Sequence, residues 1–366
     1  MLQESGQRSR RDEDPGSLWR TSNTCFAGGF LEFTITAVNP LDHEKDIKQL
    51  FVTNERPEFP GFFDRAYPHG VRAGGVSWVG RDRAGQVVMH LACFPQRFRF
   101  GEREVVGGLM INALVARPYR TFFPAHALIR RAKGDTKVRG DIDFVYTDPN
   151  EQAKAVMDMY GFARVGTLTR YVLPVGDRRR LLDGAIRLFH AGVHAVTWSQ
   201  GVAALVGHPA AEFEPAPFET PSGDSPRLRP YHSSARYAMR MEGYPTASDW
   251  WFTLARNGDA GVPAAGLLVR GPNPSGVADL QAIHRDPDLP LAGLIRGLVA
   301  WLRARACTRL QVWTVAESQF AAELCHVGFV PREGAASIVA TALTATGEAV
   351  LRSVHLWEIT SLDCDR

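Results

Sequence analysis

Apolar and polar residues alternate in short runs along the first part of the chain, and turn signals separate the runs. This period of two is typical of strands, because successive side chains of a strand point to opposite faces of a sheet. Residues 43–52 instead place Ile47, Leu50 and Phe51 on one helical face. The pattern therefore predicts a helix at 43–52 and four strands at 33–38, 76–80, 86–94 and 105–115, the last three an antiparallel meander.

Helical spacing returns after residue 120. Pro124 suits a first helical turn, where its missing N–H has no intrahelical partner. A strand is predicted at 141–146, and the Asp-Pro-Asn at 148–150 predicts a turn and helix cap. The following helix has four residues on one face, Ala153, Val156, Met157 and Tyr160. Gly161 ends this helix, and Phe162 begins a strand that reaches Val172.

The same order of elements returns in the second part of the chain. Each part has a helix that ends in a Gly-Phe pair, and Gly161-Phe162 lies 167 positions before Gly328-Phe329. The predicted strands here are 251–255, 264–270, 278–284 and 310–315, and the predicted helices are 291–302 and 320–327. We therefore expect a disordered N-terminal tail (1–29), a first domain (30–176), a helical connection and linker (177–226) and a second domain (227–366).

Composition excludes several classes of protein. The 366 residues are 45% hydrophobic and 22% charged, and a net charge of +3 is too small for a dedicated nucleic-acid binder. Five scattered cysteines without a CxxC pair fit reduced thiols and argue against a zinc site. No apolar run reaches the roughly 18 residues of a membrane span, and the polar N-terminus is unlike a signal peptide. We expect a cytoplasmic protein with no metal, membrane or nucleic-acid partner, whose oligomeric state stays open.

The order strand–helix–three strands–helix–strand–helix–strand resembles the GNAT superfamily of acyl-CoA N-acyltransferases. In that family a strand leads into V-x-P-x-Y-R-G-x-G-x-G/A-x-x-L, and a later helix carries N-x-x-A-x-x-L-Y-x-x-x-G-F. The chain matches these motifs at Val115, Tyr119, Arg120, Ala125, Leu128, Asn150, Ala153, Val156, Gly161 and Phe162. The resemblance covers about 33–175 well and 228–345 weakly. It implies an α/β (α+β) fold of two tandem GNAT-like domains, each a mixed, mostly antiparallel twisted sheet flanked by helices.

The resemblance also implies acyl-CoA, acetyl-CoA or another, as co-substrate. Backbone amides at the start of a helix suit a pyrophosphate, and a backbone N–H of the preceding strand would bind the acyl oxygen. The residues so implied are Leu114, Val115, Arg120, Thr121, Phe123, Ala125 and Asn150. Thr121 and Phe123 replace two family glycines, and Met157 replaces the tyrosine proposed as general acid. Tyr160 lies three residues beyond that position.

In the second half the corresponding loop, residues 284–288, contains Asp286 and Asp288, which would repel a pyrophosphate. Glu317 replaces the asparagine of the late motif. We therefore expect only the first half to bind coenzyme A, while the second shapes the acceptor pocket. Pro149-Asn150 and the ending W-x-x-T-x-x-D-x-D also resemble tandem proteins that accompany polysaccharide gene clusters.

Amine acylation also needs a group that accepts the ammonium proton. Asp143 is the first candidate, because an unpaired carboxylate within the apolar run 142–145 would have a raised pKa. Alternation could instead direct it to solvent. His126 is the second candidate, or it stabilises the loop. Asp363 and Asp365 could line a cleft or belong to a frayed end.

These observations favour an acyl-CoA-dependent N-acyltransferase that acts, with an acetyl group as the first expectation, on the amine of a small molecule such as an amino sugar. A Fem-type peptidyltransferase that uses aminoacyl-tRNA is a second interpretation, weakened by the modest charge and the lack of a long coiled-coil arm. A non-catalytic binding protein that keeps the fold is the third, since function depends on the site and not on the fold.

Overall fold

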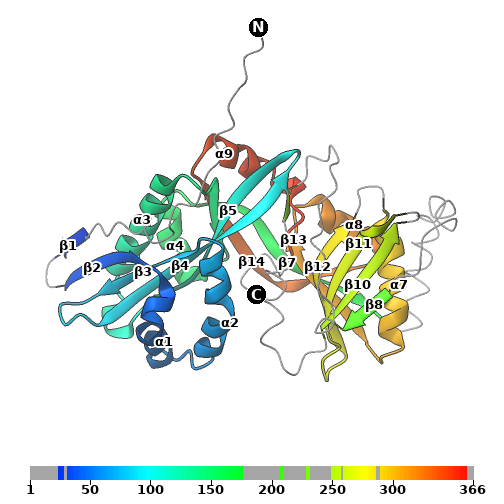
Figure 1. Cartoon of the computed structure of the whole chain (residues 1–366), viewed down its shortest axis with the longest axis horizontal. Helices are drawn as coiled ribbons and strands as arrows, with labels where there is room; N and C mark the ends of the chain where they lie inside the picture. The colour runs from blue at the N-terminus through cyan, green and yellow to red at the C-terminus, as the bar shows by residue number, and fades with distance from the viewer. Residues whose placement is uncertain are drawn as a thin grey trace, which may run out of the picture.

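The computed structural model describes residues 24–28, 31–175, 206–209, 228–230, 249–256, 259–285 and 289–360. The strands form one continuous, mostly antiparallel sheet that helices flank, which confirms the predicted fold class (Figure 1). The strand order is β1-β2-β3-β4-β5-β6-β14-β7-β13-β12-β11-β10-β8, and β9 pairs with β4. Most of the predicted helical connection and linker (177–226) lies outside the described residues, and residues 206–209 within it form a strand. Residues 24–28, within the predicted disordered tail (1–29), also form a strand.

The first half begins with an antiparallel meander. It consists of β1 (Thr24–Gly28), β2 (Leu31–Val38), β3 (Val76–Arg81), β4 (Val87–Phe100) and β5 (Arg103–Val115). The next strand, β6 (Phe144–Thr147), is parallel to β5. The helices of this half are α1 (Glu44–Thr53), α2 (Phe59–Arg72), α3 (Phe122–Arg139) and α4 (Glu151–Met159), with 3-10 turns at Pro40–His43 and Arg117–Tyr119.

Helices α2 and α3 cover opposite faces of this sheet (Figure 1). Two adjacent residues of β3 show it, because neighbouring side chains of a strand point to opposite faces. Ser77 hydrogen-bonds His90, which also contacts Tyr67 of α2, whereas Trp78 Nε1 donates to Asp135 of α3 (2.9 Å).

Helix α2 was not predicted from the sequence. Its buried residues Phe59, Phe63, Ala66 and Tyr67 do fall on one helical face. Pro60 occupies the first turn and Pro68 the interior, and prolines at these positions hide the pattern. The strand predicted at 141–146 is also different, because β6 begins at Phe144 and ends at Thr147.

The second half repeats the plan. Antiparallel strands β8 (Val206–Pro209), β10 (Asp249–Arg256), β11 (Asp259–Arg270) and β12 (Val277–Arg285) precede helix α7 (Leu291–Arg303), and β13 (Arg309–Val315) is parallel to β12. Helix α8 (Gln319–Val327) follows β13, as α4 follows β6. All four predicted strands and both predicted helices of this half are present.

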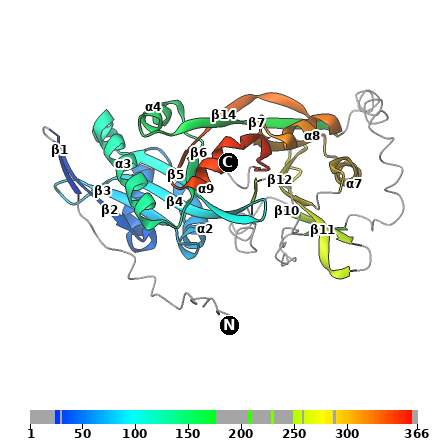
Figure 2. The same ribbon diagram turned by 90° about the horizontal axis from the view of Figure 1, so that it is seen from above.

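The last strands of the two halves are exchanged. Strand β14 (Val330–Ala342), from the second half, lies between β6 and β7, while β7 (Ala163–Pro174), from the first half, pairs with β13. Figure 2 shows β7 and β14 running side by side between the halves. Helix α9 (Ala345–Arg352) and a 3-10 turn (Val354–Leu356) then return to the first half, and β9 (Leu228–Pro230) joins the edge of β4.

The exchange joins the cores of the two halves. The hydrophobic core around Trp78, Tyr67 and Phe144 also contains Val350 and Trp357 from the end of the described chain. A second core lies between α7, α8 and the strands of the second half. Each half therefore depends on segments from the other for its buried surface.

Candidate functional site

Strands β5 and β6 pair over a short stretch and then separate. Their parallel ladder joins residues 107–109 to residues 144–146, and β5 continues beyond it to Val115. Glycine is required at the closed end, because a Cβ on Gly107 or Gly108 would lie 2.7 Å from Phe144 or Cys93. Among the described residues, β4 and β6 are the strands that pair with β5. We call the diverging part, residues 110–115 of β5 with residues 147–150 at and after the end of β6, the first fork.

A β-bulge interrupts β5 inside the first fork. The register with β4 shifts between His90, opposite Leu114, and Ala92, opposite Ile111, so β5 carries one extra residue. Asn112 lies at this bulge with φ +55°, a left-handed conformation that asparagine tolerates better than most residues. The next residue, Ala113, is exposed although it lies within a strand.

Backbone directions beyond the bulge follow from two hydrogen bonds. Ala116 N–H donates to Val88 O of β4 (2.8 Å), so by alternation Leu114 also directs its backbone groups to β4. Val115 directs its groups the other way, and its carbonyl accepts Arg120 Nε (2.9 Å). Of the two strand residues predicted to bind the acyl oxygen, Leu114 therefore faces β4 and Val115 faces the fork.

A buried polar network lies behind the bulge, on the α2 side of the sheet. His90 Nδ1 lies 3.0 Å from Asn112 O, and His90 Nε2 lies 3.2 Å from Ser77 Oγ and 3.5 Å from Tyr67 Oη. Asn112 Nδ2 donates to Tyr67 Oη (3.3 Å). Burial lowers the pKa of His90 to about 4, so the ring is neutral near pH 7. This network was not predicted from the sequence, where its signal is a lone histidine in the apolar run 87–94.

The loop between β5 and α3 is held by its own hydrogen bonds and by its neighbours. The N–H groups of Tyr119, Arg120 and Thr121 donate to carbonyls within the loop. Arg117 N–H donates to Asn54 Oδ1 (2.9 Å), and the Arg117 side chain pairs with Glu55. The start of α3 follows at once, so its first-turn amides lie at the mouth of the first fork.

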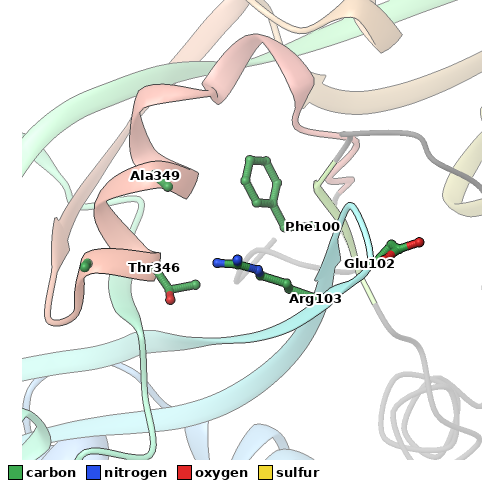
Figure 3. A pocket seen from close by; sticks show the side chains of 6 residues that line it. Phe100, Glu102, Arg103, Thr346 and Ala349 are labelled. Atoms are coloured by element: carbon green, nitrogen blue, oxygen red, sulfur yellow. The ribbon is translucent and has the colours of Figure 1, made fainter.

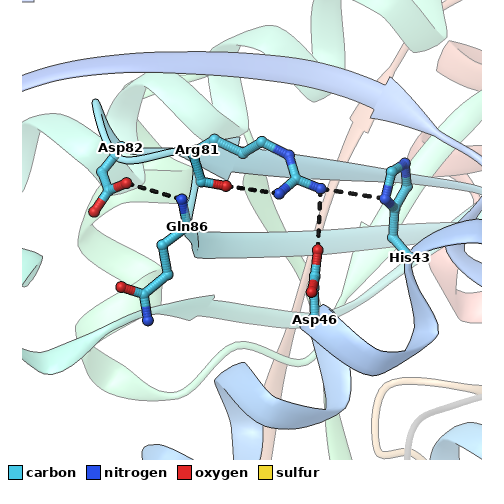
Figure 4. A network of polar contacts seen from close by, with 6 residues as sticks. His43, Asp46, Arg81, Asp82 and Gln86 are labelled. Atoms are coloured by element: carbon cyan, nitrogen blue, oxygen red, sulfur yellow. Dashed lines mark hydrogen bonds and ion pairs between the residues drawn. The ribbon is translucent and has the colours of Figure 1, made fainter.

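Tyr119 ties this loop to the β3–β4 turn. Its hydroxyl donates to Asp82 (2.8 Å), a hydrogen bond that raises the pKa of Tyr119. Asp82 in turn accepts a hydrogen bond from the backbone N–H of Gln86 (2.9 Å). The neighbouring Arg81 side chain binds His43 and Asp46, each at 3.2 Å (Figure 4). The turn is therefore a fixed anchor for the loop.

The structure brings the predicted coenzyme A residues together around the first fork. Arg120 and Thr121 are exposed in the loop, and Thr121 is the N-cap residue of α3. Phe123 is 76% exposed in the first turn, where the family has a glycine, and Ala125 follows in the same turn. Asn150 caps α4, where its side chain accepts the N–H of Ala153 (2.9 Å).

The predicted base Asp143 lies elsewhere. It precedes β6, at the closed end of the β5–β6 pair, and not within the strand as predicted. Its carboxylate accepts the N–H of Val106 (2.9 Å) and the hydroxyl of Thr344 (2.8 Å), and its carbonyl accepts the N–H of Leu343 (2.8 Å). These contacts join β5 to the start of α9, which is a structural role.

His126, the other predicted base, contacts Tyr160. Tyr160 Oη lies 2.7 Å from His126 Nε2, and burial raises the pKa of this tyrosine. The Tyr160 carbonyl accepts Lys133, whose amine also donates to Thr341 (3.1 Å). Met157, at the family's tyrosine position, is buried. The pair of His126 and Tyr160 therefore joins α3 to the end of α4.

The second half has an equivalent fork that is filled. Strands β12 and β13 pair over residues 277–279 and 309–311 and then separate. Residues 357–360, here the closing segment, lie between them. Thr360 Oγ1 donates to Gln281 O (2.6 Å), Thr314 Oγ1 donates to Ile359 O (2.7 Å), and Thr314 and Thr360 form an antiparallel bridge. Protein therefore occupies the position that the first fork offers to a ligand.

Other predicted residues of the second half have different positions. Glu317 accepts hydrogen bonds from the N–H (2.8 Å) and hydroxyl (2.9 Å) of Thr167, so it joins the turn after β13 to β7. His284 lies on β12. Asp286, Asp288, Asp363 and Asp365 lie outside the described residues.

A cavity of about 500 Å³ lies apart from both forks. It is open to the surface between the β4–β5 hairpin and α9, and Figure 3 shows the Arg103 side chain extending toward Thr346. Its lining residues are Phe100, Glu102, Arg103, Ala345, Thr346 and Ala349. In the part of the chain that the structure describes, no three metal-ligating side chains converge, and no helix is long and apolar enough to cross a membrane.

Solved structures show which fold this arrangement is. A GCN5-related N-acetyltransferase from Anabaena variabilis matches with a TM-score of 0.56 at 12% identity, over 86% of this chain and 74% of that one. A GCN5-related N-acetyltransferase from Kribbella flavida matches with a TM-score of 0.57 at 13% identity, over 86% of this chain and 73% of that one. A conserved Enterococcus faecalis protein of unknown function, described as a probable N-acyltransferase, matches with 0.59 at 8% identity, over 86% and 73%.

The chain therefore has the fold of the GCN5-related N-acetyltransferases, and its two forks show that the fold occurs in tandem. The resemblance predicted from the sequence motifs is confirmed at this level. No family model matches the sequence, and a comparison with curated proteins finds no match.

Proposed function

We propose that this chain is an acyl-CoA-dependent N-acyltransferase with one acyl-CoA site, at the first fork. The observation that carries the proposal is the contrast between the forks. The first combines diverging parallel strands, a bulge with an exposed residue, and the start of an 18-residue helix at its mouth. The second is filled by the closing segment.

The residues present fit the pyrophosphate of coenzyme A. A helix N-terminus offers unpaired N–H groups and the positive end of the helix dipole. Arg120 lies one residue before the N-cap of α3, and its guanidinium already reaches the edge of β5. Val115 supplies backbone groups that face the fork, which would bind the amides of the pantetheine arm.

Bound acyl-CoA supplies a thioester, whose carbonyl carbon an amine attacks. The new C–N bond replaces the C–S bond, the amine loses a proton and the thiolate gains one. The protein must stabilise the negative charge on the carbonyl oxygen, and backbone N–H groups at a strand edge suit this task. Asp143 lies at the closed end of β6, so the proposal assigns it no proton transfer.

The acceptor is proposed to be the amine of a small molecule, such as an amino sugar. The net charge of +3 gives no reason to expect a polyanionic partner. The acetyl group is the first acyl group to test, because two solved structures with this fold are described as N-acetyltransferases.

The test is release of free thiol from acetyl-CoA in the presence of a panel of amines, followed with a chromogenic reagent. The proposal expects release that depends on the amine and decreases in Arg120→Ala. Tight acetyl-CoA binding without turnover for any amine would favour a non-catalytic binding protein. The buried Met157, which replaces the tyrosine proposed as the family's general acid, would account for that result. Turnover only with aminoacyl-tRNA would favour the peptidyltransferase interpretation.

A further inference from the structure

The network behind the first fork is a closed ring of hydrogen bonds. A carbonyl oxygen can only accept, so His90 Nδ1 must carry the proton that it shares with Asn112 O (3.0 Å). His90 Nε2 is then an acceptor for the hydroxyls of Ser77 (3.2 Å) and Tyr67 (3.5 Å). Asn112 Nδ2 donates to Tyr67 Oη and completes the ring.

This ring stands in apolar surroundings. His90, Ser77 and Tyr67 are all fully buried, and the Phe51 ring packs against His90 with centroids 5.5 Å apart. Burying polar groups is unfavourable unless each finds its partner, so an apolar set of similar volume would fill this space more easily. The arrangement is therefore best explained by what the ring holds, which is the backbone of the bulge.

The peptide bond links the ring to the fork. In a planar trans peptide, the carbonyl of Asn112 and the N–H of Ala113 point in opposite directions. Because His90 fixes the Asn112 carbonyl on the α2 side, the Ala113 N–H points away from His90. Ala113 is the exposed residue of the bulge, inside the first fork.

We infer that His90 is a positioning residue, which aims the Ala113 N–H at the acyl carbonyl oxygen of a thioester bound in the first fork. The inference rests on the proposed function and deepens it, because it names the donor and the side chain that orients it. The N–H at the bulge is then fixed before the substrate arrives, the condition under which such donors stabilise developing charge most.

The test is the infrared stretch of the thioester carbonyl in bound acetyl-CoA labelled with carbon-13 at the carbonyl. A well-aimed donor polarises the carbonyl and lowers its frequency. His90→Asn keeps an N–H near the Nδ1 position, whereas His90→Gln moves it toward the Nε2 position. We expect the lowered frequency in the parent and in His90→Asn, and its loss in His90→Gln.

Kinetics give a second readout for the same variants. Losing one such donor lowers kcat by about 10²–10³-fold, so we expect His90→Gln to lose at least tenfold in kcat. Its acetyl-CoA affinity should stay within about threefold of the parent, because the pyrophosphate contacts lie elsewhere. Cys93→Ala is the matched control, since Cys93 is buried on the same strand and faces Gly108 on the other side of the sheet.

The outcomes separate the inference from the proposed function. Equal carbonyl frequencies in the parent and His90→Gln overturn the inference and leave acyl transfer standing. Failure of the parent to bind acetyl-CoA overturns both.

If the His90 variants do not fold, nitrogen NMR of the parent provides the test. The inference requires His90 to be neutral and protonated on Nδ1 at pH 7, among uncharged neighbours that include the Tyr67 phenol. A ring protonated on Nε2, or a charged ring, overturns it.

Discussion

Two threonine hydroxyls tie the closing segment to the strands of the second fork. Thr314 and Thr360 are both buried, and each hydroxyl donates to a backbone carbonyl. Without the hydroxyl, water could not reach that carbonyl to donate the lost hydrogen bond. Thr→Val keeps the shape and removes the hydroxyl. Each change leaves one buried carbonyl unsatisfied, so each should lower the free energy of unfolding by about 1–3 kcal/mol.

The two changes should not be additive. Both hydroxyls hold the same four residues, so once one change loosens the segment, the second has less to remove. Urea unfolding of the parent, the two single variants and the double variant gives the coupling energy. We expect the double variant to lose less than the sum of the singles by at least about 0.5 kcal/mol.

Thr136→Val is the matched control for this series. Thr136 is also buried, but its hydroxyl donates to Ala132 O, a carbonyl that the α3 backbone already bonds. Its loss should cost well under about 1 kcal/mol. If Thr314→Val and Thr360→Val cost no more than this control, the segment is not held in the fork as described.

Three further predictions follow from the first half. Arg120→Ala should weaken acetyl-CoA binding roughly tenfold in calorimetry, as for a lost charged hydrogen bond, and an unchanged affinity would remove Arg120 from the site. Tyr119→Phe should weaken acetyl-CoA binding several-fold with little change in Tm, because the loop loses the hydrogen bond from Tyr119 to Asp82 (2.8 Å). A lower Tm with normal acetyl-CoA binding would contradict this prediction. The third concerns pH: the pKa of His90 is lowered to about 4 in the folded chain, so the unfolded chain binds more protons between pH 6.5 and 4. The stability that comes from the neutral His90 is complete above pH 6.5 and is lost as pH falls, on the order of 3 kcal/mol by pH 4. The free energy of unfolding of His90→Gln, measured against pH, should lack this loss.

The strand and helix order could be predicted because local patterns carry it. Alternation predicted ten of the fourteen described strands, whereas β1, β8, β9 and β14 were not predicted. The motif spacing placed Arg120 and Asn150 near helix starts. The exchange of β7 and β14 could not be predicted. The strand that pairs with β6 is selected by the packing of both halves, which no local pattern of residues records.

The candidate site was predicted less well. Asp143 was interpreted as part of a strand because the apolar residues 142–145 surround it, whereas the strand starts one residue later. His90 was passed over because a single histidine in an apolar strand is commonly a core residue. Its partners Tyr67 and Asn112 are 23 and 22 residues away, and only the fold brings them together.

Amide hydrogen exchange with and without acetyl-CoA shows whether the first fork is the acyl-CoA site, because it locates the ligand as well as detecting it. We predict slower exchange in peptides that cover residues 111–127 and 147–156, around the first fork. Peptides over β12 and β13 should not change, since the closing segment already fills the second fork. Protection across β12 and β13, or no protection around the first fork at saturating acetyl-CoA, would contradict this prediction.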